Sequence, residues 1–119
     1  MDSNKLIFEQ VAEMVENQIL DGLLKSEDQS PSTTEFSNVY GINPATARKG
    51  LNILVDDGIL YKKRGMGMYV TENAKEIIIE KRKQEYLNTV LPDLIKNIKL
   101  LGISKDDLIA EIEKSYKEL

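Results

Sequence analysis

The chain has 119 residues, a hydrophobic content of 41% and a net charge of −4, which suffices for about one compact domain and little more. It contains no cysteine, histidine or tryptophan, which excludes a disulfide framework, a Cys/His zinc site and thiol or imidazole catalysis. Because no segment has signal-peptide character or about 18 consecutive apolar residues, we expect a soluble cytoplasmic protein without membrane association, metal or cofactor.

Charge is distributed unevenly along the chain. Residues 1–42 carry two basic and eight acidic side chains, whereas residues 43–71 carry five basic and two acidic ones. Residues 72–119 hold nine basic and ten acidic side chains, interspersed in the manner of solvated helix faces. Because affinity for nucleic acid comes largely from neutralised phosphates, the middle of the chain is the candidate for contact with a polyanion.

The first predicted element is an amphipathic helix over about residues 5–22, with Gly22 as its stop. Apolar side chains recur along it at spacings of three to four, with glutamates between them. These apolar residues are Leu6, Ile7, Val11, Val15, Ile19 and Leu23. A polar loop over residues 25–31 follows.

A capping box predicts where the second helix begins. The Ser32 hydroxyl can accept from the amide three residues on, and Glu35 can reach back to the Ser32 amide. The helix should run over about residues 33–40 and end at Gly41, which can adopt the left-handed conformation. Its side chains predicted to face inward are Phe36 and Val39.

A third helix is predicted from Pro44 to about Asp57, since Asn43 is a good N-cap and proline suits the first helical position. Its apolar stripe, which should pack on the first two helices, consists of Ala47, Leu51, Leu54 and Val55. The residues on its other sides are Ala45, Thr46, Arg48, Lys49 and Asn52. Small residues permit close approach, and Arg48 and Asn52 lie one turn apart as potential hydrogen-bonders to phosphates or base edges. This is the candidate recognition helix.

A hairpin is predicted after Gly58, because residues 59–63 and 68–71 are rich in β-formers and the turn between them is glycine-rich. Gly65 and Gly67 allow positive φ angles and leave their amides bare, so the tip can approach a sugar–phosphate chain. Positive charge at this tip comes from Lys62, Lys63 and Arg64. Alone, the hairpin would be a turn with solvated lysines; after a helix-turn-helix it is a wing, on which Tyr61 and Tyr69 pack.

From about Leu6 to Val70, the chain resembles the winged helix-turn-helix domain of the GntR family of bacterial transcription regulators. The matching segments are Ile7–Glu13, Pro31–Ser32, Ile42–Leu51 and Asp57–Val70. The resemblance implies DNA contacts at the start of the second helix, around the third helix and at the wing, by Ser32, Asn43, Ala45, Thr46, Arg48, Arg64, Gly65, Met66 and Gly67. Thr34, Lys49 and Asn52 complete the candidate DNA-binding set.

The match departs from the family at Thr34, where most relatives carry an arginine. A base or phosphate contact of the family is therefore expected to be missing. We expect a modified operator preference or weaker binding per monomer.

The pattern changes after Thr71, and a helix is predicted over about residues 74–101 with apolar residues at alternating spacings of four and three. Pro92 should kink it near Asn88 or break it into two pieces. Gly102 ends it, and a capping box of Ser104 with Asp107 opens a last helix over about residues 105–118. The predicted dimerisation residues of this tail are Leu87, Leu91, Leu94, Ile98, Leu101, Leu108 and Ile112. The alternative is that the tail folds back on its own winged domain.

We therefore expect a mainly α fold with a small β-hairpin: a winged helix-turn-helix domain at residues 1–71, then a two-helix dimerisation region at residues 72–119. The short tail resembles the smallest GntR subfamily, named after YtrA, whose members lack the large effector domain and often control transporter operons. The expected function is a homodimeric transcriptional repressor on a palindromic double-stranded operator, with one half-site per subunit.

Two other classes of protein compete with this hypothesis. The first is a winged-helix interaction module whose basic wing docks an acidic protein, and salt-dependent retention on duplex DNA separates it from a regulator. An enzyme is disfavoured, because there is no Walker-type loop and no evident catalytic pair of carboxylates. No residue pattern distinguishes regulation by a small-molecule effector from constitutive binding.

Overall fold

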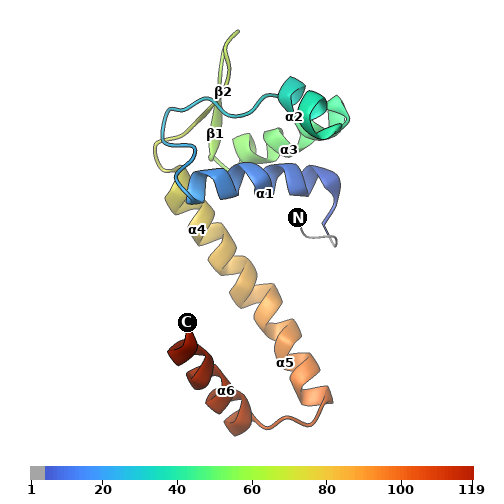
Figure 1. Cartoon of the computed structure of the whole chain (residues 1–119), viewed down its shortest axis with the longest axis vertical. Helices are drawn as coiled ribbons and strands as arrows, with labels where there is room; N and C mark the ends of the chain where they lie inside the picture. Colours follow the sequence, from blue (N-terminus) through green and yellow to red (C-terminus); the bar gives the residue numbers. More distant parts are fainter. Residues whose placement is uncertain (1–4) are drawn as a thin grey trace. The chain divides into compact units, whose positions relative to one another are not determined.

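The computed structural model describes residues 5–119. Its elements, in chain order, are α1 (Ile7–Leu20), α2 (Thr33–Tyr40), α3 (Pro44–Asp56), β1 (Leu60–Lys63), β2 (Gly67–Val70), α4 (Ala74–Glu85), the π-helical turn η1 (Tyr86–Val90), α5 (Leu91–Leu100) and α6 (Lys105–Glu118) (Figure 1). The mainly helical fold with a two-stranded antiparallel hairpin is as predicted. The chain divides into two compact units, which we call the winged unit, up to Glu80, and the tail unit, Lys81–Leu119.

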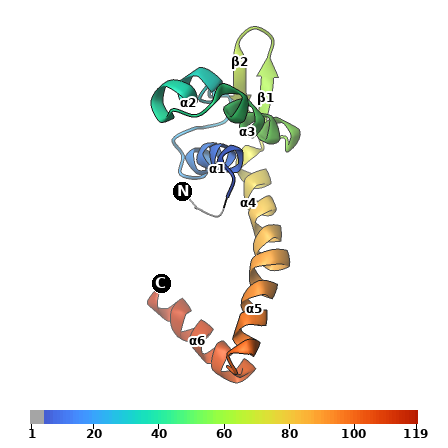
Figure 2. The same ribbon diagram turned by 90° about the vertical axis from the view of Figure 1, so that its right-hand side faces the viewer.

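The core of the winged unit lies where α1, α2, α3 and the hairpin meet. Apolar residues recur every three to four positions on α1 and α3, so each helix turns an apolar side toward the other. Both ribbon views show these helices side by side (Figures 1 and 2). Burial of each large apolar side chain contributes about 1.5–3 kcal/mol. The largest fully buried side chains are Phe36, Leu51, Leu54, Ile59, Leu60, Ile78, Val11, Val15 and Val70. Because Ile78 belongs to this core, the winged unit includes the first part of α4.

A glycine sets the distance between α1 and α3. A β-carbon on Gly50 would lie 2.5 Å from the Phe8 carbonyl oxygen and 2.8 Å from the Val11 β-carbon. Real β-carbons do not approach other heavy atoms this closely, so no larger residue fits unless the helices move apart. The apolar stripe predicted for α3 did not include this position.

The prediction that Val39 faces inward was wrong, and the buried stripe of the first helix is shorter than predicted. Val39 is 70% exposed. The helix α2 has only eight residues, and Phe36 is the one that it buries in the core. At the ends of α1, Leu6 and Leu23 are also exposed, since the helix spans Ile7–Leu20 and both residues lie outside it. Ile7, at its first position, is half exposed.

The loop between α1 and α2 extends the hairpin by a short third segment. The Glu27 amide donates to the Val70 carbonyl, the Val70 amide donates to the Asp28 carbonyl, and the Ser30 amide donates to the Met68 carbonyl, each at 2.9 Å. Sequence analysis identified only a polar loop here, since the segment lacks the alternation that marks a strand. The structure therefore adds an edge to the wing that the sequence pattern does not indicate.

In the tail unit, the interruption predicted near Asn88 takes the form of a π-helical turn. Pro92 has no N–H to donate to the carbonyl four residues earlier, so the α-helical ladder cannot continue there. The turn η1 occupies Tyr86–Val90, and α5 follows. The bounds of α6 agree with prediction, and the Ser104 hydroxyl accepts from the Asp107 amide at 3.0 Å.

Among residues 5–119, no helix combines the length and the apolar character that crossing a membrane requires.

Candidate nucleic-acid interface

The N-terminus of α2 is capped as predicted. The Glu35 amide donates to the Ser32 hydroxyl at 3.0 Å, and the Ser32 amide donates to the Glu35 carboxylate at 3.3 Å. Ser32 is half-buried, while Thr34, the second residue of the helix, is exposed. The reciprocal bonds fix the direction of the first turn, whose remaining amides form the positive end of the helix dipole. A phosphate is the kind of group that such a helix end attracts.

The turn between α2 and α3 is held by local bonds. Gly41 has a φ of 65°, and the Ser37 hydroxyl donates to the Ile42 carbonyl at 2.8 Å. The Ala45 amide then donates to the Asn43 side-chain oxygen at 2.8 Å, with Pro44 at the first helical position. Since the cap uses the oxygen of Asn43, the amide nitrogen of its side chain is the group left to contact a partner.

The exposed side of α3 carries part of the predicted set. Ala45 and Arg48 are exposed, whereas Thr46 and Asn52 are half-buried. Positions four apart on a helix are neighbours, so Arg48 and Asn52 share one side of α3. The side-chain oxygen of Asn52 is enclosed and has no hydrogen-bond partner among the described residues. Arg48 is therefore the long donor that this side offers to a partner.

Lys49 has a different environment from Arg48. Its ammonium nitrogen lies 4.1 Å from the centroid of the Phe8 ring, within the range of a cation–π interaction. The structure thus directs Lys49 toward the start of α1. It does not bring this lysine together with Arg48.

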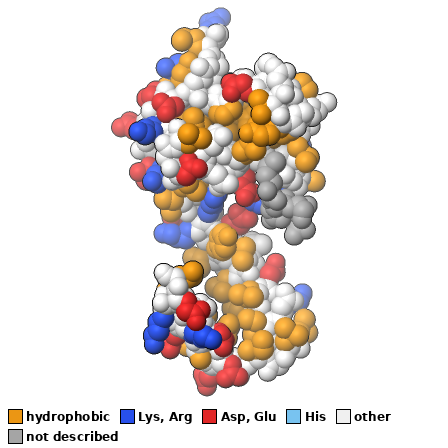
Figure 3. Space-filling view, viewed as in Figure 1, with side chains coloured by type: hydrophobic (Ala, Val, Ile, Leu, Met, Phe, Trp, Pro, Cys, Tyr) orange, Lys and Arg blue, Asp and Glu red, His pale blue; other side chains and the backbone are white. Residues whose placement is uncertain are grey.

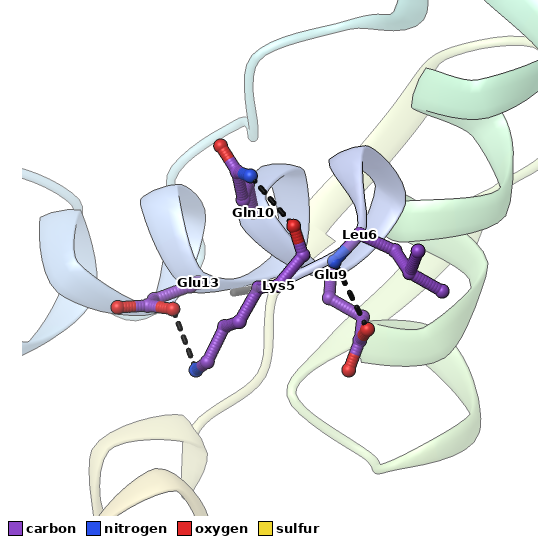
Figure 4. A network of polar contacts seen from close by, with 5 residues as sticks. All are labelled: Lys5, Leu6, Glu9, Gln10 and Glu13. Atoms are coloured by element: carbon purple, nitrogen blue, oxygen red, sulfur yellow. Dashed lines mark hydrogen bonds and ion pairs between the residues drawn. The ribbon is translucent and has the colours of Figure 1, made fainter. Parts of the chain in front are cut away.

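Polar contacts fix the start of α1 (Figure 4). The Lys5 ammonium lies 2.6 Å from the Glu13 carboxylate. The Gln10 side-chain amide donates to the Lys5 carbonyl at 2.8 Å, and the Leu6 amide donates to the Glu9 carboxylate at 3.2 Å. Lys5, one of the two basic residues before Asn43, is thus engaged in an ion pair.

The wing tip is a short glycine turn between β1 and β2. The strands pair with Leu60 opposite Val70 and Lys63 opposite Gly67. Gly65 and Gly67 have φ angles of 74° and 98°, which confirms the predicted need for glycine at both positions. Arg64, Gly65 and Met66 are all exposed at this tip, which points away from α1 in both ribbon views (Figure 2).

One face of the wing carries an aromatic pair. The rings of Tyr61 and Tyr69 lie 6.1 Å apart, which confirms that they pack on the hairpin. The Lys63 ammonium lies 4.2 Å from the Tyr69 ring centroid, so this lysine covers the pair, while Lys62 lies on the opposite face of the strand and is exposed. The Tyr61 hydroxyl donates to the Glu27 carboxylate, and this hydrogen bond raises the pKa of Tyr61 above its ordinary value.

Sequence reasoning missed the contribution of the α1–α2 loop to this site. Gln29 forms a bridge with Tyr69, and its side-chain amide donates to the Met66 carbonyl at 3.1 Å. The two residues of this hydrogen bond are 37 positions apart, so no periodicity or short motif could indicate it.

Two small hollows lie on the winged unit. Among the described residues, no cluster of three or more acidic, cysteine or histidine side chains could hold a metal ion. One hollow, lined by residues such as Ile19, Leu24 and Thr71, has a volume of about 250 Å³. A second, beside Phe36 and Tyr40, has about 140 Å³. Pockets for drug-sized ligands usually measure about 300–1,000 Å³.

Comparison with known proteins connects this geometry to transcription. Residues 7–70 match the family model described as "Bacterial regulatory proteins, gntR family". The chain is 31% identical to the HTH-type transcriptional repressor YtrA of Bacillus subtilis (strain 168), over 97% of this chain and 90% of that protein. That relative is a regulator of transcription rather than an enzyme.

Two solved structures extend the similarity to three dimensions. A putative GntR-family regulator from Bacteroides thetaiotaomicron is 32% identical with a TM-score of 0.74, covering 95% of each chain. BusR of S. agalactiae, in complex with its busAB promoter DNA, is 26% identical with a TM-score of 0.62. That match covers 96% of this chain and 57% of BusR.

Proposed function

Because the chain belongs to the gntR family of bacterial regulatory proteins, it is a DNA-binding transcriptional regulator, and we propose that it acts as a homodimeric repressor on a palindromic operator. The observation that carries the DNA-binding part of this proposal is that three features suited to contact with DNA lie in the winged unit. A capped α2 N-terminus, the exposed start of α3 and a basic glycine tip belong to one compact unit. A regulator of this kind acts on the chromosome, so its place is the bacterial cytoplasm.

In the proposed complex, α3 enters the major groove. The small side chains of Ala45 and Thr46 let its first turn approach the bases, and Arg48 extends from its exposed side. An arginine can donate two hydrogen bonds to guanine or hold a phosphate. The α2 N-terminus at Ser32 and the Asn43 amide would fix the register on the backbone.

The wing would contact the backbone of the neighbouring groove through Arg64 and the exposed glycine turn at Gly65 and Gly67. Lys63 contributes less in this proposal, since its ammonium lies on the Tyr69 ring. Thr34 stands where most relatives have an arginine, so the long donor of the family is replaced by a short hydroxyl. We therefore propose an operator preference that differs from that of arginine-containing relatives.

The tail unit supports the dimer. Hydrophobic side chains gather on its visible face (Figure 3). Leu87 is 52% exposed, Leu94 47% and Ile112 44%, although apolar side chains gain about 25 cal/mol per Å² when buried. The proposed occupant of this face is the tail of a second copy, because one stripe repeated at heptad spacing is complementary to itself across a two-fold axis. The seam consists of Leu87, Leu91, Leu94, Ile98, Leu101, Leu108 and Ile112.

Repression is the proposed output, through occlusion of polymerase at a promoter. The relative YtrA carries the name of a repressor, and this chain matches it over nearly its whole length. A dimer that holds two adjacent half-sites occupies DNA that polymerase needs.

Selection of bound fragments from promoter DNA, with the purified full chain at two salt concentrations, tests this function. If the protein neutralises six or more phosphates, raising the salt concentration from 50 to 200 mM should weaken binding by about a thousandfold or more. We expect a palindromic sequence to be enriched at both concentrations. Retention on an acidic protein with no enrichment of duplex DNA would instead favour the interaction module and contradict the repressor.

A further inference from the structure

We propose that Gln29 is a positioning residue that sets the wing tip for contact with DNA. The inference rests on the wing contact of the proposed function and assigns a role to the α1–α2 loop. Gln29 acts through the backbone of the tip, since its side chain bonds to the Met66 carbonyl and not to a side chain of the hairpin.

The contact is specific in its geometry. The Gln29 amide nitrogen donates to the Met66 carbonyl at 3.1 Å. A β-carbon on Gly67 would lie 3.0 Å from the same nitrogen, so the amide rests against the face of this glycine. Glycine is thus favoured at position 67 for two reasons: its φ angle is 98°, and a side chain there would crowd Gln29. A larger residue there would push the side chain away from the tip.

The loop that carries Gln29 is itself anchored to the wing on both sides of that residue. The Glu27 amide donates to the Val70 carbonyl, and the Ser30 amide donates to the Met68 carbonyl. The Tyr61 hydroxyl donates to the Glu27 carboxylate, which adds a side-chain bond to the other strand. These contacts place Gln29 opposite Tyr69 and its amide within reach of the tip.

The same loop continues into the cap of α2. Two residues separate Gln29 from Ser32, the N-cap that belongs to the proposed DNA contact. One short segment therefore joins the two places where the backbone of the winged unit would meet phosphates. A rigid segment here fixes the distance between the α2 N-terminus and the wing tip.

A glycine turn needs such a restraint if it is to bind well. Within the hairpin, the Met66 amide donates to the Lys63 carbonyl and closes the turn. Two glycines leave the tip many alternative conformations, and DNA binding must restrict them at a cost in entropy. Because the Gln29 bond already restricts the free protein, less ordering remains for the complex.

The test compares Gln29→Ala and Gln29→Glu with the parent chain on the duplex that selection enriches most strongly. Loss of one hydrogen bond should weaken binding by about two- to tenfold. Gln29→Glu should weaken it further, because a carboxylate cannot donate to the Met66 carbonyl and adds negative charge near phosphates. Ser26→Ala, an exposed change in the same loop, is the matched control and should leave affinity unchanged.

A double-mutant cycle with Arg64→Ala separates positioning from a general effect on the fold. If Gln29 acts through the tip, its substitution should cost less than about twofold once Arg64 is absent. Amide relaxation of Gly65 and Gly67 in the free protein should show faster motion in Gln29→Ala, at an unchanged melting temperature. An equal loss with and without Arg64, or unchanged affinity in both Gln29 variants, would overturn the inference.

The same cycle distinguishes failure of the wing contact itself. If Arg64→Ala weakens binding but the Gln29 variants do not, the wing contact stands and only the role of Gln29 is wrong. If Arg64→Ala has no effect, the wing contact in the proposed function is wrong, and the role of Gln29 in DNA binding falls with it.

Discussion

At the scale of the residue, the neighbouring cations Arg48 and Lys49 differ in what they can do. Arg48 is exposed on α3, whereas the Lys49 ammonium lies over the Phe8 ring. The two carry the same charge, so the neighbouring position supplies a built-in control. The affinity for DNA should therefore depend more on Arg48 than on Lys49.

Arg48→Ala should weaken operator binding in one of two ways. If Arg48 contacts a base, the loss is roughly 1–3 kcal/mol and selectivity relaxes at one operator position. If it holds a phosphate, binding weakens for all sequences and the slope of log K against log salt falls by about one. Titration of fluorescent operator at several salt concentrations measures both quantities. Lys49→Ala should have the smaller effect, and an Arg48 variant with unaltered affinity and slope would exclude Arg48 from the interface.

Tyr61 offers a prediction on pH. Because the Glu27 carboxylate accepts a hydrogen bond from its hydroxyl, the pKa of Tyr61 is raised. The neutral phenol is thus favoured in the fold, so its contribution to stability is fully present below pH of about 10 and is lost as pH rises through the raised pKa. Stability near neutral pH should not change through this group.

Alkaline titration followed by phenolate absorbance checks this prediction. One transition should lie above the ordinary pKa of a tyrosine, and Glu27→Gln should remove most of the shift. Tyr69→Phe, which deletes the neighbouring hydroxyl, serves as the control and should leave the late transition in place. Loss of that transition in the control variant would assign it to Tyr69 instead.

At the scale of the element, Gly50 decides how closely α1 and α3 pack. Alanine normally stabilises a helix by about 1 kcal/mol relative to glycine. Here the added carbon would meet the Phe8 carbonyl oxygen and the Val11 side chain, and overpacking of this kind costs typically 1–3 kcal/mol. The two effects have opposite signs, so the change in the free energy of unfolding shows which of them is larger.

We expect Gly50→Ala to lower the free energy of unfolding despite its better helix propensity. Chemical denaturation followed by circular dichroism measures the difference. Asp56→Ala, an exposed change at the end of the same helix, should alter stability by less than about 0.5 kcal/mol. A more stable Gly50→Ala protein would mean that moving α1 and α3 apart costs less than the gain in helix propensity.

At the scale of the whole molecule, the tail seam determines the proposed stoichiometry. Replacement of both Leu94 and Ile98 by Asp puts two charges where a dimer would bury apolar side chains, which is strongly unfavourable. We expect a monomer in sedimentation velocity and much weaker operator binding, since each winged unit must then bind its half-site alone.

The control for this seam changes net charge equally at other positions. Thr89→Asp combined with Lys96→Ala also lowers the net charge by two, and both residues lie at heptad positions away from the seam. This protein should remain a dimer with parental affinity. If the Leu94 and Ile98 variant also sediments as a dimer, the proposed seam is wrong and another surface must join the subunits.

Much of the fold could be predicted because the signals are local. The Ser32–Glu35 box, the Asn43 cap with Pro44 and the glycine tip act through groups within four residues of one another. Pro92 likewise interrupts its helix by removing an N–H four residues from its acceptor. Such features depend on the geometry of the local backbone and of the side chains next to it, so their residues indicate them without knowledge of the rest of the chain.

The sequence by itself thus determined the order of the elements, the capped starts of α2, α3 and α6, and the family to which the chain belongs. Only the tertiary structure decided that Val39 is exposed, that Lys49 lies over Phe8 and that Gln29 bonds to the wing tip. These outcomes depend on which element packs beside which, and the partner residues lie tens of positions apart. A sequence pattern of period two or 3.6 predicts which residues share one side of a strand or helix. It does not predict which other element packs against that side, and contacts such as these depend on that packing.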